Sequence, residues 1–315
     1  MNIVLLDSAT LPVPLTAPAW AGEWSARLAT RAADVVHALE DAAIAITNKV
    51  PIRAADLKRL PKLRFICIAA TGFDCIDIDA CRESGVIVSN VPGYSAQSVS
   101  EWALASIFAL RRNLFAYRET ARTGWASSPN FCVHDAPILD IAGSTLGIVG
   151  RGAIGSSLAR LARAVGMNVM FAEHRGRLTV REGFTSFDEV VRTADVLSLH
   201  CPLTEATRKL IDAPTLRAMK RGALLVNSAR GGLVDSAALL DALSTGHLGG
   251  AALDVLPQEP PDPYEPLLAY AHPNLIVTPH ISWAATHAAN RLNAGIEANL
   301  AAFHAGAPIN VVNGA

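Results

Sequence analysis

Residues 145–160 read Thr-Leu-Gly-Ile-Val-Gly-Arg-Gly-Ala-Ile-Gly-Ser-Ser-Leu-Ala-Arg, and this stretch decides the fold. An apolar run typical of a β-strand comes first, glycines follow in the spacing G-x-G-x-x-G, and an amphipathic helical pattern comes next. In that order the first glycine permits a tight turn, the second lets the backbone approach a pyrophosphate, and the third lets the helix pack closely on the strand. The helix N-terminus adds unpaired N–H groups and a positive dipole end. The spacing alone is weak evidence, but the strand before it and the helix after it favour a dinucleotide site. The loop residues expected to contact the dinucleotide are Gly150, Arg151, Gly152, Ala153, Ile154 and Gly155.

Length and composition bound the remaining possibilities. The 315 residues are 51% hydrophobic and 17% charged, which suggests about two domains with large cores. A formal net charge of −1 argues against a nucleic-acid surface, for which a basic stripe is expected. No apolar run reaches the roughly 18 residues of a membrane span, and the N-terminus resembles a first strand rather than a signal peptide. Five cysteines without a Cys-x-x-Cys pair favour reduced thiols in the cytoplasm and no metal site.

Strand-like runs alternate with amphipathic helical stretches along nearly the whole chain. This alternation predicts doubly wound parallel sheets covered by helices on both faces. A dinucleotide-binding domain normally begins with the strand that carries its glycine loop, so the roughly 140 residues before this loop predict a separate α/β domain. Segment 123–141 has no clean period and is expected to form an excursion that contacts another subunit. We expect strands near 3–6, 43–47, 64–68, 86–89, 145–149, 168–172, 196–199, 223–227, 250–254 and 275–278, and long helices near 98–112 and 287–303.

Glu173 bears on the choice of dinucleotide. It lies 18 residues past Gly155 at the end of the next predicted strand, where an acidic residue normally accepts hydrogen bonds from the adenosine ribose. A carboxylate also repels a 2′-phosphate, so Glu173 favours NAD. His174 and Arg175 follow directly, and Arg175 could pair with a 2′-phosphate if Glu173 swung away, so NADP stays possible.

Three polar residues follow predicted strands in the second half of the chain. Arg230 comes just after an apolar run, Glu259 lies in a proline-bounded turn, and His280 follows Thr-Pro. Because ligands of open α/β sheets bind outside the carboxyl ends of the strands, the three side chains and the glycine loop are expected to share one cleft.

This trio suits the reduction of a 2-keto acid. Histidine can donate a proton to the nascent alkoxide, and a neighbouring carboxylate orients the imidazole and favours its protonated form. The planar cationic fork of arginine can hold the substrate carboxylate and polarise the carbonyl. Taken singly, each residue also fits an ordinary role: Arg230 in a loop salt bridge, Glu259 in a solvated turn, His280 as a satisfied strand-end histidine.

Segments 150–155, 227–235, 254–260 and 279–283 together resemble the D-isomer-specific 2-hydroxyacid dehydrogenases, and the resemblance covers nearly the whole chain. It implies an NAD-dependent dehydrogenase that interconverts small 2-keto and D-2-hydroxy acids. It also implies a flavodoxin-like substrate domain, residues 1–98 with 287–315, and a Rossmann cofactor domain, residues 99–286. Members of the family commonly form homodimers through the cofactor domain.

The resemblance also assigns roles to single residues. Arg230 would bind substrate, His280 would be the acid/base, and Glu259 would pair with the histidine. Thr71 and Gly72 belong to a first-domain loop whose N–H groups bind the substrate carboxylate, and Trp283 would close over the substrate or pack in the protein. Besides the glycine loop, the implied cofactor contacts are Glu173, His174, Arg175, His200, Cys201, Pro202, Thr207, Ser228, Ala229, Asp254, which would hold the nicotinamide carboxamide, and His280.

Within the family, segments 47–50, 70–72 and 173–175 are most similar to glycerate dehydrogenases, also called hydroxypyruvate or glyoxylate reductases. Two positions depart from the family pattern: Cys75 replaces a frequent asparagine, and 100–102 read Ser-Glu-Trp where Ala-Glu-His is frequent. The alternatives are an NAD-sensing protein of the corepressor kind on the same fold, or an enzyme whose donor is another 2-hydroxy acid, formate or phosphite.

Overall fold

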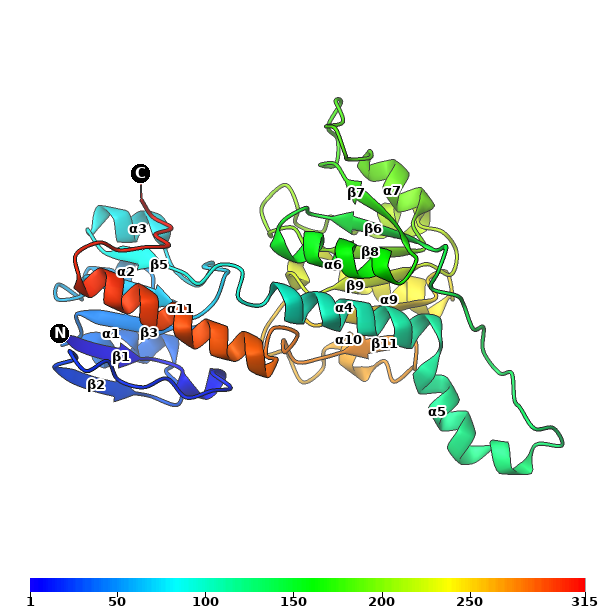
Figure 1. The fold of residues 1–315 in the computed structure, drawn as a ribbon, viewed down its shortest axis with the longest axis horizontal. Coiled ribbons are helices and arrows are strands. Elements are labelled where there is room, and N and C mark those ends of the chain that lie inside the picture. The colour runs from blue at the N-terminus through cyan, green and yellow to red at the C-terminus, as the bar shows by residue number, and fades with distance from the viewer. Residues whose placement is uncertain (315) are drawn as a thin grey trace. The chain divides into compact units, whose positions relative to one another are not determined.

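The computed structural model describes residues 1–314. The chain forms two compact units, one made of Met1–Ser95 with the chain from Ala284 onward, the other of Ala96–Trp283 (Figure 1). In the described residues, no helix combines the length and apolarity needed to cross a membrane.

The first unit is a parallel sheet in the order β2-β1-β3-β4-β5, which is the flavodoxin-like order. β3 and β4 are buried along their whole length, which explains why their residues are apolar except for Thr47 at the end of β3. The strands are β1 (Asn2–Leu5), β2 (Glu23–Ala26), β3 (Ile44–Thr47), β4 (Phe65–Ile68) and β5 (Ile87–Ser89). The helices are η1 (Ser8–Thr10), η2 (Ala32–Asp34), α1 (Val35–Leu39), α2 (Ala54–Leu57), α3 (Ile78–Glu83) and, from the C-terminal part of the chain, α11 (Thr286–His304).

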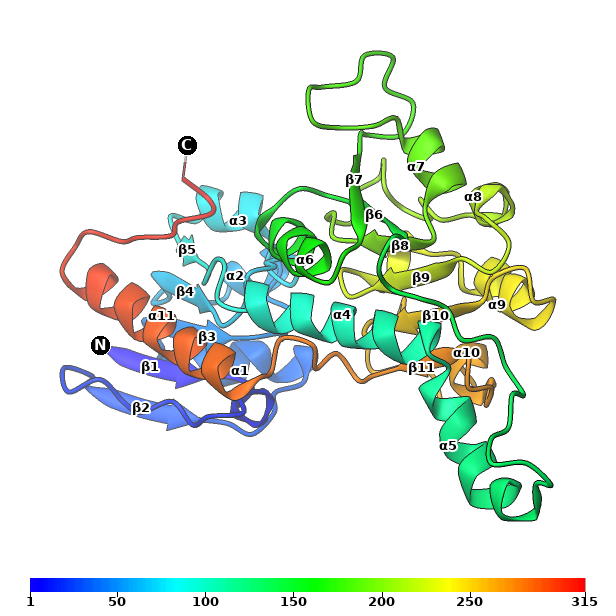
Figure 2. The ribbon, with the colours of Figure 1, turned by 45° about the vertical axis from the view of Figure 1, so that its right-hand side comes forward.

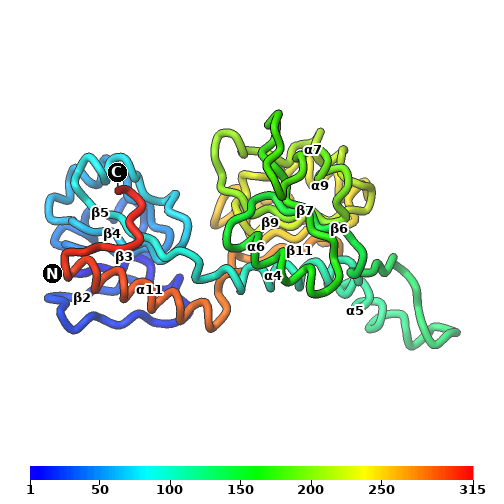
Figure 3. The backbone as a smooth tube through the Cα atoms, turned by 45° about the horizontal axis from the view of Figure 1, so that its top comes forward, coloured from blue at the N-terminus to red at the C-terminus, as the bar shows by residue number. Residues whose placement is uncertain are grey.

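The C-terminal helix α11 belongs to the first unit and runs along its sheet (Figure 3). Phe303 stacks on Phe65 of β4 with ring centroids 4.4 Å apart, and the buried Asn299 amide donates to the Asn90 carbonyl. Gly295 lies so close to Val91 that a Cβ there would overlap the valine side chain. These contacts return the end of the chain to the unit in which it began.

Strand β2 was not expected from the sequence. Glu23, Trp24, Ser25 and Ala26 are exposed or half-buried, and β2 lies at the edge of the sheet beside β1. An edge strand with little burial needs no apolar run, so hydrophobic pattern could not reveal it.

The second unit is a six-stranded parallel sheet in the order β11-β10-β9-β8-β6-β7. Its strands are β6 (Thr145–Val149), β7 (Asn168–Ala172), β8 (Val196–Leu199), β9 (Leu224–Asn227), β10 (Gly250–Leu253) and β11 (Leu275–Val277). Its helices are α4 (Ala96–Arg111), α5 (Leu114–Thr123), η3 (Trp125–Ser127), α6 (Ala153–Ala164), α7 (Phe187–Thr193), α8 (Ala213–Ala218), η4 (Gly231–Leu233), α9 (Ser236–Ser244) and α10 (Pro266–Ala269).

Helices cover both faces of this second sheet. α4 and α6 lie side by side on one face (Figure 2), and α7, α8 and α9 contribute to the core on the other. Successive residues of β9 alternate between the two cores: Leu224 and Val226 face α4 and α6, whereas Leu225 between them faces the opposite side. The expected doubly wound fold is therefore confirmed for this sheet.

β6 lies at the point where the strand order reverses, since it pairs with β7 on one side and β8 on the other. Beyond β7, a single parallel bridge joins Ala172 to Thr185, at the position where a dinucleotide-binding sheet has its third strand. The crevice at the carboxyl end of β6 is where such sheets bind ligands.

Candidate active site

Three glycines shape the loop after β6: Gly150 and Gly155 lie against backbone carbonyls, and Gly152 faces open space. Gly150 has φ +104°, and a Cβ there would come within 2.5 Å of the His200 carbonyl oxygen. A Cβ on Gly155 would overlap the Gly150 carbonyl, so α6 can begin this close to the strand only with glycine there. Gly152 precedes the first turn of α6, and a Cβ there would meet nothing within 4 Å. The loop therefore leaves open space at the N-terminus of α6, which fits a pyrophosphate.

His200, Cys201 and Pro202 follow β8 and line the other side of the switch point. His200 Nε2 lies 2.8 Å from the Ser198 hydroxyl, and burial lowers the pKa of His200 from 6.5 to about 4. Burial also raises the pKa of the Cys201 thiol to about 11, so the thiol stays protonated. Thr207 donates its hydroxyl to the Pro202 carbonyl at 2.7 Å and so closes the turn that follows.

Glu173 ends β7 as expected, but its carboxylate is enclosed by protein donors. Its side chain is 1% exposed, and Arg181 grips both oxygens through Nε and Nη2 at 2.7 Å. The backbone N–H groups of His174 and Arg181 donate to the same carboxylate. The Arg181 guanidinium, helped by these N–H groups, lowers the pKa of Glu173 to about 2.

The cationic side chains next to Glu173 point in different directions. Arg175 hydrogen-bonds the Leu210 carbonyl and Asp212, both at 3.2 Å. Arg151, from the glycine loop, lies over the rings of Phe171 and Phe184, at 5.0 Å and 5.5 Å from their centroids. His174 itself is exposed.

Arg230 lies in a turn built by its neighbours at the end of β9. The Asn227 side chain accepts from the Ala229 N–H and donates to the Arg230 carbonyl, at 3.0 Å and 2.9 Å. Gly231 is pressed against the backbone of Leu256, where a Cβ would overlap the carbonyl. The Arg230 turn thus packs directly on the turn that leads to Glu259. In the same turn, the buried Ser228 hydroxyl has no partner among the described residues.

Glu259 and His280 form a close pair at the ends of β10 and β11. His280 Nδ1 lies 2.6 Å from Glu259 Oε2, and the other oxygen, Oε1, accepts from the Leu256 N–H at 3.0 Å. The His280 side chain is 24% exposed and the Glu259 side chain is 36% exposed, so the pair faces solvent in part. Glu259 therefore fixes Nδ1 of the imidazole, and Nε2 is the nitrogen on the other side of the ring.

Asp254 holds the turn that carries His280. This fully buried carboxylate accepts from the Thr278 hydroxyl at 2.5 Å and from the N–H groups of Ile281 and Ser282 at 2.9 Å. His280 itself has φ +55°, a conformation that non-glycine residues adopt only when neighbours fix it. The Trp283 indole donates to the His280 carbonyl at 2.9 Å and closes the same turn.

Thr71 and Gly72 lie in the first unit, after β4. The Thr71 hydroxyl donates to the Val91 carbonyl, and the Asn90 amide donates to the Thr71 carbonyl, which fixes the loop. Over the described part of the chain, the N–H groups of Gly72 and Phe73 have no hydrogen-bond partner. Such N–H groups fit an anion.

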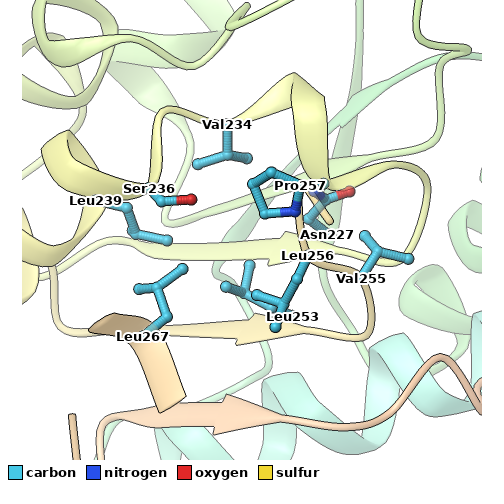
Figure 4. A pocket seen from close by; sticks show the side chains of 10 residues that line it. Asn227, Val234, Ser236, Leu239, Leu253, Val255, Leu256, Pro257 and Leu267 are labelled. Atoms are coloured by element: carbon cyan, nitrogen blue, oxygen red, sulfur yellow. The ribbon is translucent and has the colours of Figure 1, made fainter. Parts of the chain in front are cut away.

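A small hollow includes Gly231, the residue after Arg230, in its lining (Figure 4). The lining is mostly apolar, with Leu239, Leu253 and Leu267, and its polar members are Asn227 and Ser236. Arg230, Glu259 and His280 are not among its lining residues. The hollow is a packing gap under the site, not a place for a charged substrate.

Sequence reasoning missed two residues that build this site: Asn227 shapes the Arg230 turn, and Arg181 encloses Glu173. Asp254 was expected only as a cofactor contact, and the structure shows that its carboxylate holds the His280 turn. For Asn227 the signal was a polar residue at the end of an apolar strand. For Arg181 the only signal was a loop rich in arginine.

Fold and loop geometry first define a class: an α/β protein that binds a dinucleotide at its switch point, with an acid/base pair at the neighbouring strand ends. Known proteins narrow this class. The model of the D-isomer specific 2-hydroxyacid dehydrogenase NAD binding domain matches residues 104–282. A glycerate dehydrogenase from Methylorubrum extorquens is 46% identical over 280 residues, covering 89% of this chain and 88% of the relative. A hydroxypyruvate reductase from Blautia hydrogenotrophica is 34% identical, with coverage of 89% and 88%.

A solved structure agrees with the sequence relatives. The D-lactate dehydrogenase from Aquifex aeolicus, complexed with NAD and lactic acid, superposes with a TM-score of 0.83 at 27% identity and covers all of both chains. The chain belongs to the D-isomer-specific 2-hydroxyacid dehydrogenases, a family of NAD-dependent oxidoreductases.

Proposed function

We propose that this enzyme uses NADH to reduce a small 2-keto acid, hydroxypyruvate or glyoxylate, to the corresponding D-2-hydroxy acid. The observation that carries the proposal is the Glu259–His280 contact of 2.6 Å beside the Arg230 turn, in a chain whose relatives include a glycerate dehydrogenase and a hydroxypyruvate reductase.

The residues of the trio divide the chemistry between them. Arg230 holds the substrate carboxylate and polarises the keto oxygen. The dinucleotide, when bound, supplies the hydride that forms the new C–H bond. His280 Nε2 donates the proton that forms the new O–H bond, and Glu259 stabilises the imidazolium before that transfer.

The dinucleotide would be held by groups that the fold leaves suited to it. The open space over Gly152 and the N–H groups at the start of α6 fit the pyrophosphate, and His200, Cys201 and Pro202 flank it after β8. Ser228, Ala229 and Asp254 are proposed to lie toward the nicotinamide. Thr71 and Gly72 are proposed to bind the substrate carboxylate through backbone N–H groups, and Trp283 to contact the substrate.

The test is a panel assay in which oxidation of NADH is followed by its near-ultraviolet absorbance with hydroxypyruvate, glyoxylate, pyruvate and a buffer control. We expect turnover with hydroxypyruvate or glyoxylate well above that with pyruvate. Binding of NADH without turnover of any 2-keto acid would refute the proposal and favour a nucleotide-sensing protein.

We further propose a homodimer in the cytoplasm, formed through the second unit. Exposed apolar side chains on α5 and the segment after it support this, because such groups mark interfaces: Leu114, Phe115, Trp125 and Phe131. The five free cysteines fit a reducing compartment. Light scattering of the purified chain measures the oligomer; a monomer would exclude the dimer.

A further inference from the structure

The hydrogen bonds from Arg181 and from the His174 N–H together use every acceptor site of the Glu173 carboxylate. An ionised carboxylate offers about four lone-pair sites. Oε1 accepts from the His174 N–H at 2.8 Å and from Arg181 Nη2 at 2.7 Å. Oε2 accepts from Arg181 Nε at 2.7 Å and from the Arg181 N–H at 3.2 Å. A ribose diol needs two acceptor sites, and here none is left.

The carboxylate is also hidden. Its side chain is 1% exposed, whereas the Arg181 side chain in front of it is 44% exposed. A nucleotide that reaches the end of β7 therefore meets the guanidinium and not the carboxylate. The negative charge that would repel a 2′-phosphate is neutralised by a bidentate ion pair.

Arg181 keeps donors for a second partner. A guanidinium carries five N–H groups, and the carboxylate takes only one from Nε and one from Nη2. The group is also held in place from the side, since it lies 4.3 Å from the centroid of the Phe184 ring. Arg177, 47% exposed and 3.8 Å from Glu173, adds a second positive charge at the same spot.

We infer that Arg181, oriented by Glu173 and assisted by Arg177, is a receptor for the 2′-phosphate, so that the enzyme accepts NADP(H) as well as NAD(H). In this arrangement Glu173 is a positioning residue for an arginine rather than the acceptor of the ribose hydroxyls. The inference rests on the proposed dinucleotide site, and it names the residue that sets nucleotide preference within it.

Nucleotide fragments test the inference without turnover. Calorimetry of the full chain with adenosine 2′,5′-bisphosphate and with 5′-AMP isolates the contribution of the 2′-phosphate. We expect the bisphosphate to bind at least as tightly as 5′-AMP, and Arg181→Gln to weaken it about 10- to 100-fold while 5′-AMP changes less than about threefold. The control is Arg192→Gln, which removes an exposed arginine of α7 and should leave both affinities unchanged. A bisphosphate that binds wild type more weakly than 5′-AMP, or equally well to wild type and Arg181→Gln, overturns the inference.

Glu173→Gln provides the second variant, should Arg181→Gln disturb the loop. If Glu173 positions Arg181, Glu173→Gln should weaken adenosine 2′,5′-bisphosphate more than it weakens 5′-AMP. If the carboxylate instead takes the ribose hydroxyls, Glu173→Gln should weaken 5′-AMP about tenfold or more and the bisphosphate less, and the inference is wrong. Failure of NADH itself to bind counts against the proposed function. Binding of NADH without a response to the 2′-phosphate counts against the Arg181 inference alone.

Discussion

Two carboxylates of the second unit follow strands of the same sheet but differ in their exposure and in their hydrogen bonds. Glu173, after β7, is 1% exposed and saturated by four hydrogen bonds, and the Arg181 guanidinium lowers its pKa to about 2. Glu259, after β10, is 36% exposed and shares one oxygen with His280. Glu173 is therefore ionised throughout the neutral pH range. Glu259 lies against an imidazole, the side chain that commonly serves in proton transfer.

The difference separates recognition from proton transfer. An ion pair whose carboxylate is buried and saturated keeps its geometry, but it has no proton to exchange near neutrality. A half-exposed carboxylate–imidazole pair can pass a proton to a substrate. The nucleotide side of the sheet therefore carries a fixed ion pair, and the Glu259–His280 side is the one proposed to transfer a proton.

Removing His280 should have the largest effect on turnover. We expect His280→Ala to lower kcat with the best 2-keto acid about 100- to 10,000-fold, because the proton donor to the alkoxide is lost. NADH affinity, measured by fluorescence titration, should stay within about threefold. His272→Ala removes another histidine of the same unit and serves as the control. Near-normal turnover of His280→Ala would remove this residue from the mechanism.

Glu259→Gln should weaken the same side more moderately. Glutamine can still meet the imidazole but no longer favours its charged form, so kcat should fall about 10- to 100-fold. Steady-state kinetics with the best 2-keto acid measure the effect. A kcat equal to that of wild type would show that Glu259 only supports the turn.

Most of the fold could be predicted because buried parallel strands are apolar runs. Residues 224–226, for example, are apolar at every position because both faces of β9 are covered. β2 escaped prediction because an exposed edge strand leaves no such signature. The vestigial third strand, a single bridge at Thr185, is too short to carry a pattern at all.

Only those candidate site residues that directly follow a strand or its turn could be predicted from the sequence. Arg230, Glu259 and His280 each follow an apolar strand, and the parallel sheet brings those ends together. Arg181 lies in a loop eight residues past Glu173, and its course back to the carboxylate depends on a three-dimensional turn that no periodicity encodes. The position of Glu173 at the end of a strand could therefore be predicted, whereas its partner Arg181 could not.

The burial of His200 should make the stability of the folded chain sensitive to acid. Burial lowers the pKa of His200 from 6.5 to about 4, so between these values the unfolded chain binds a proton that the folded chain does not. The free energy of unfolding must then fall as pH drops from 6.5 to 4, by about 1–3 kcal/mol. His200→Gln, whose amide can still meet Ser198, should lose this part of the pH dependence. Urea denaturation above pH 6.5 and near pH 4 measures the difference between the two proteins.

Protonation of Glu173 lowers the free energy of unfolding further. This loss begins only below pH 4.5, the ordinary pKa of the group, because its folded pKa is about 2, and it should be the same in wild type and variant. An equal acid response of wild type and variant down to pH 4 would mean that burial does not lower the pKa of His200 in the folded chain.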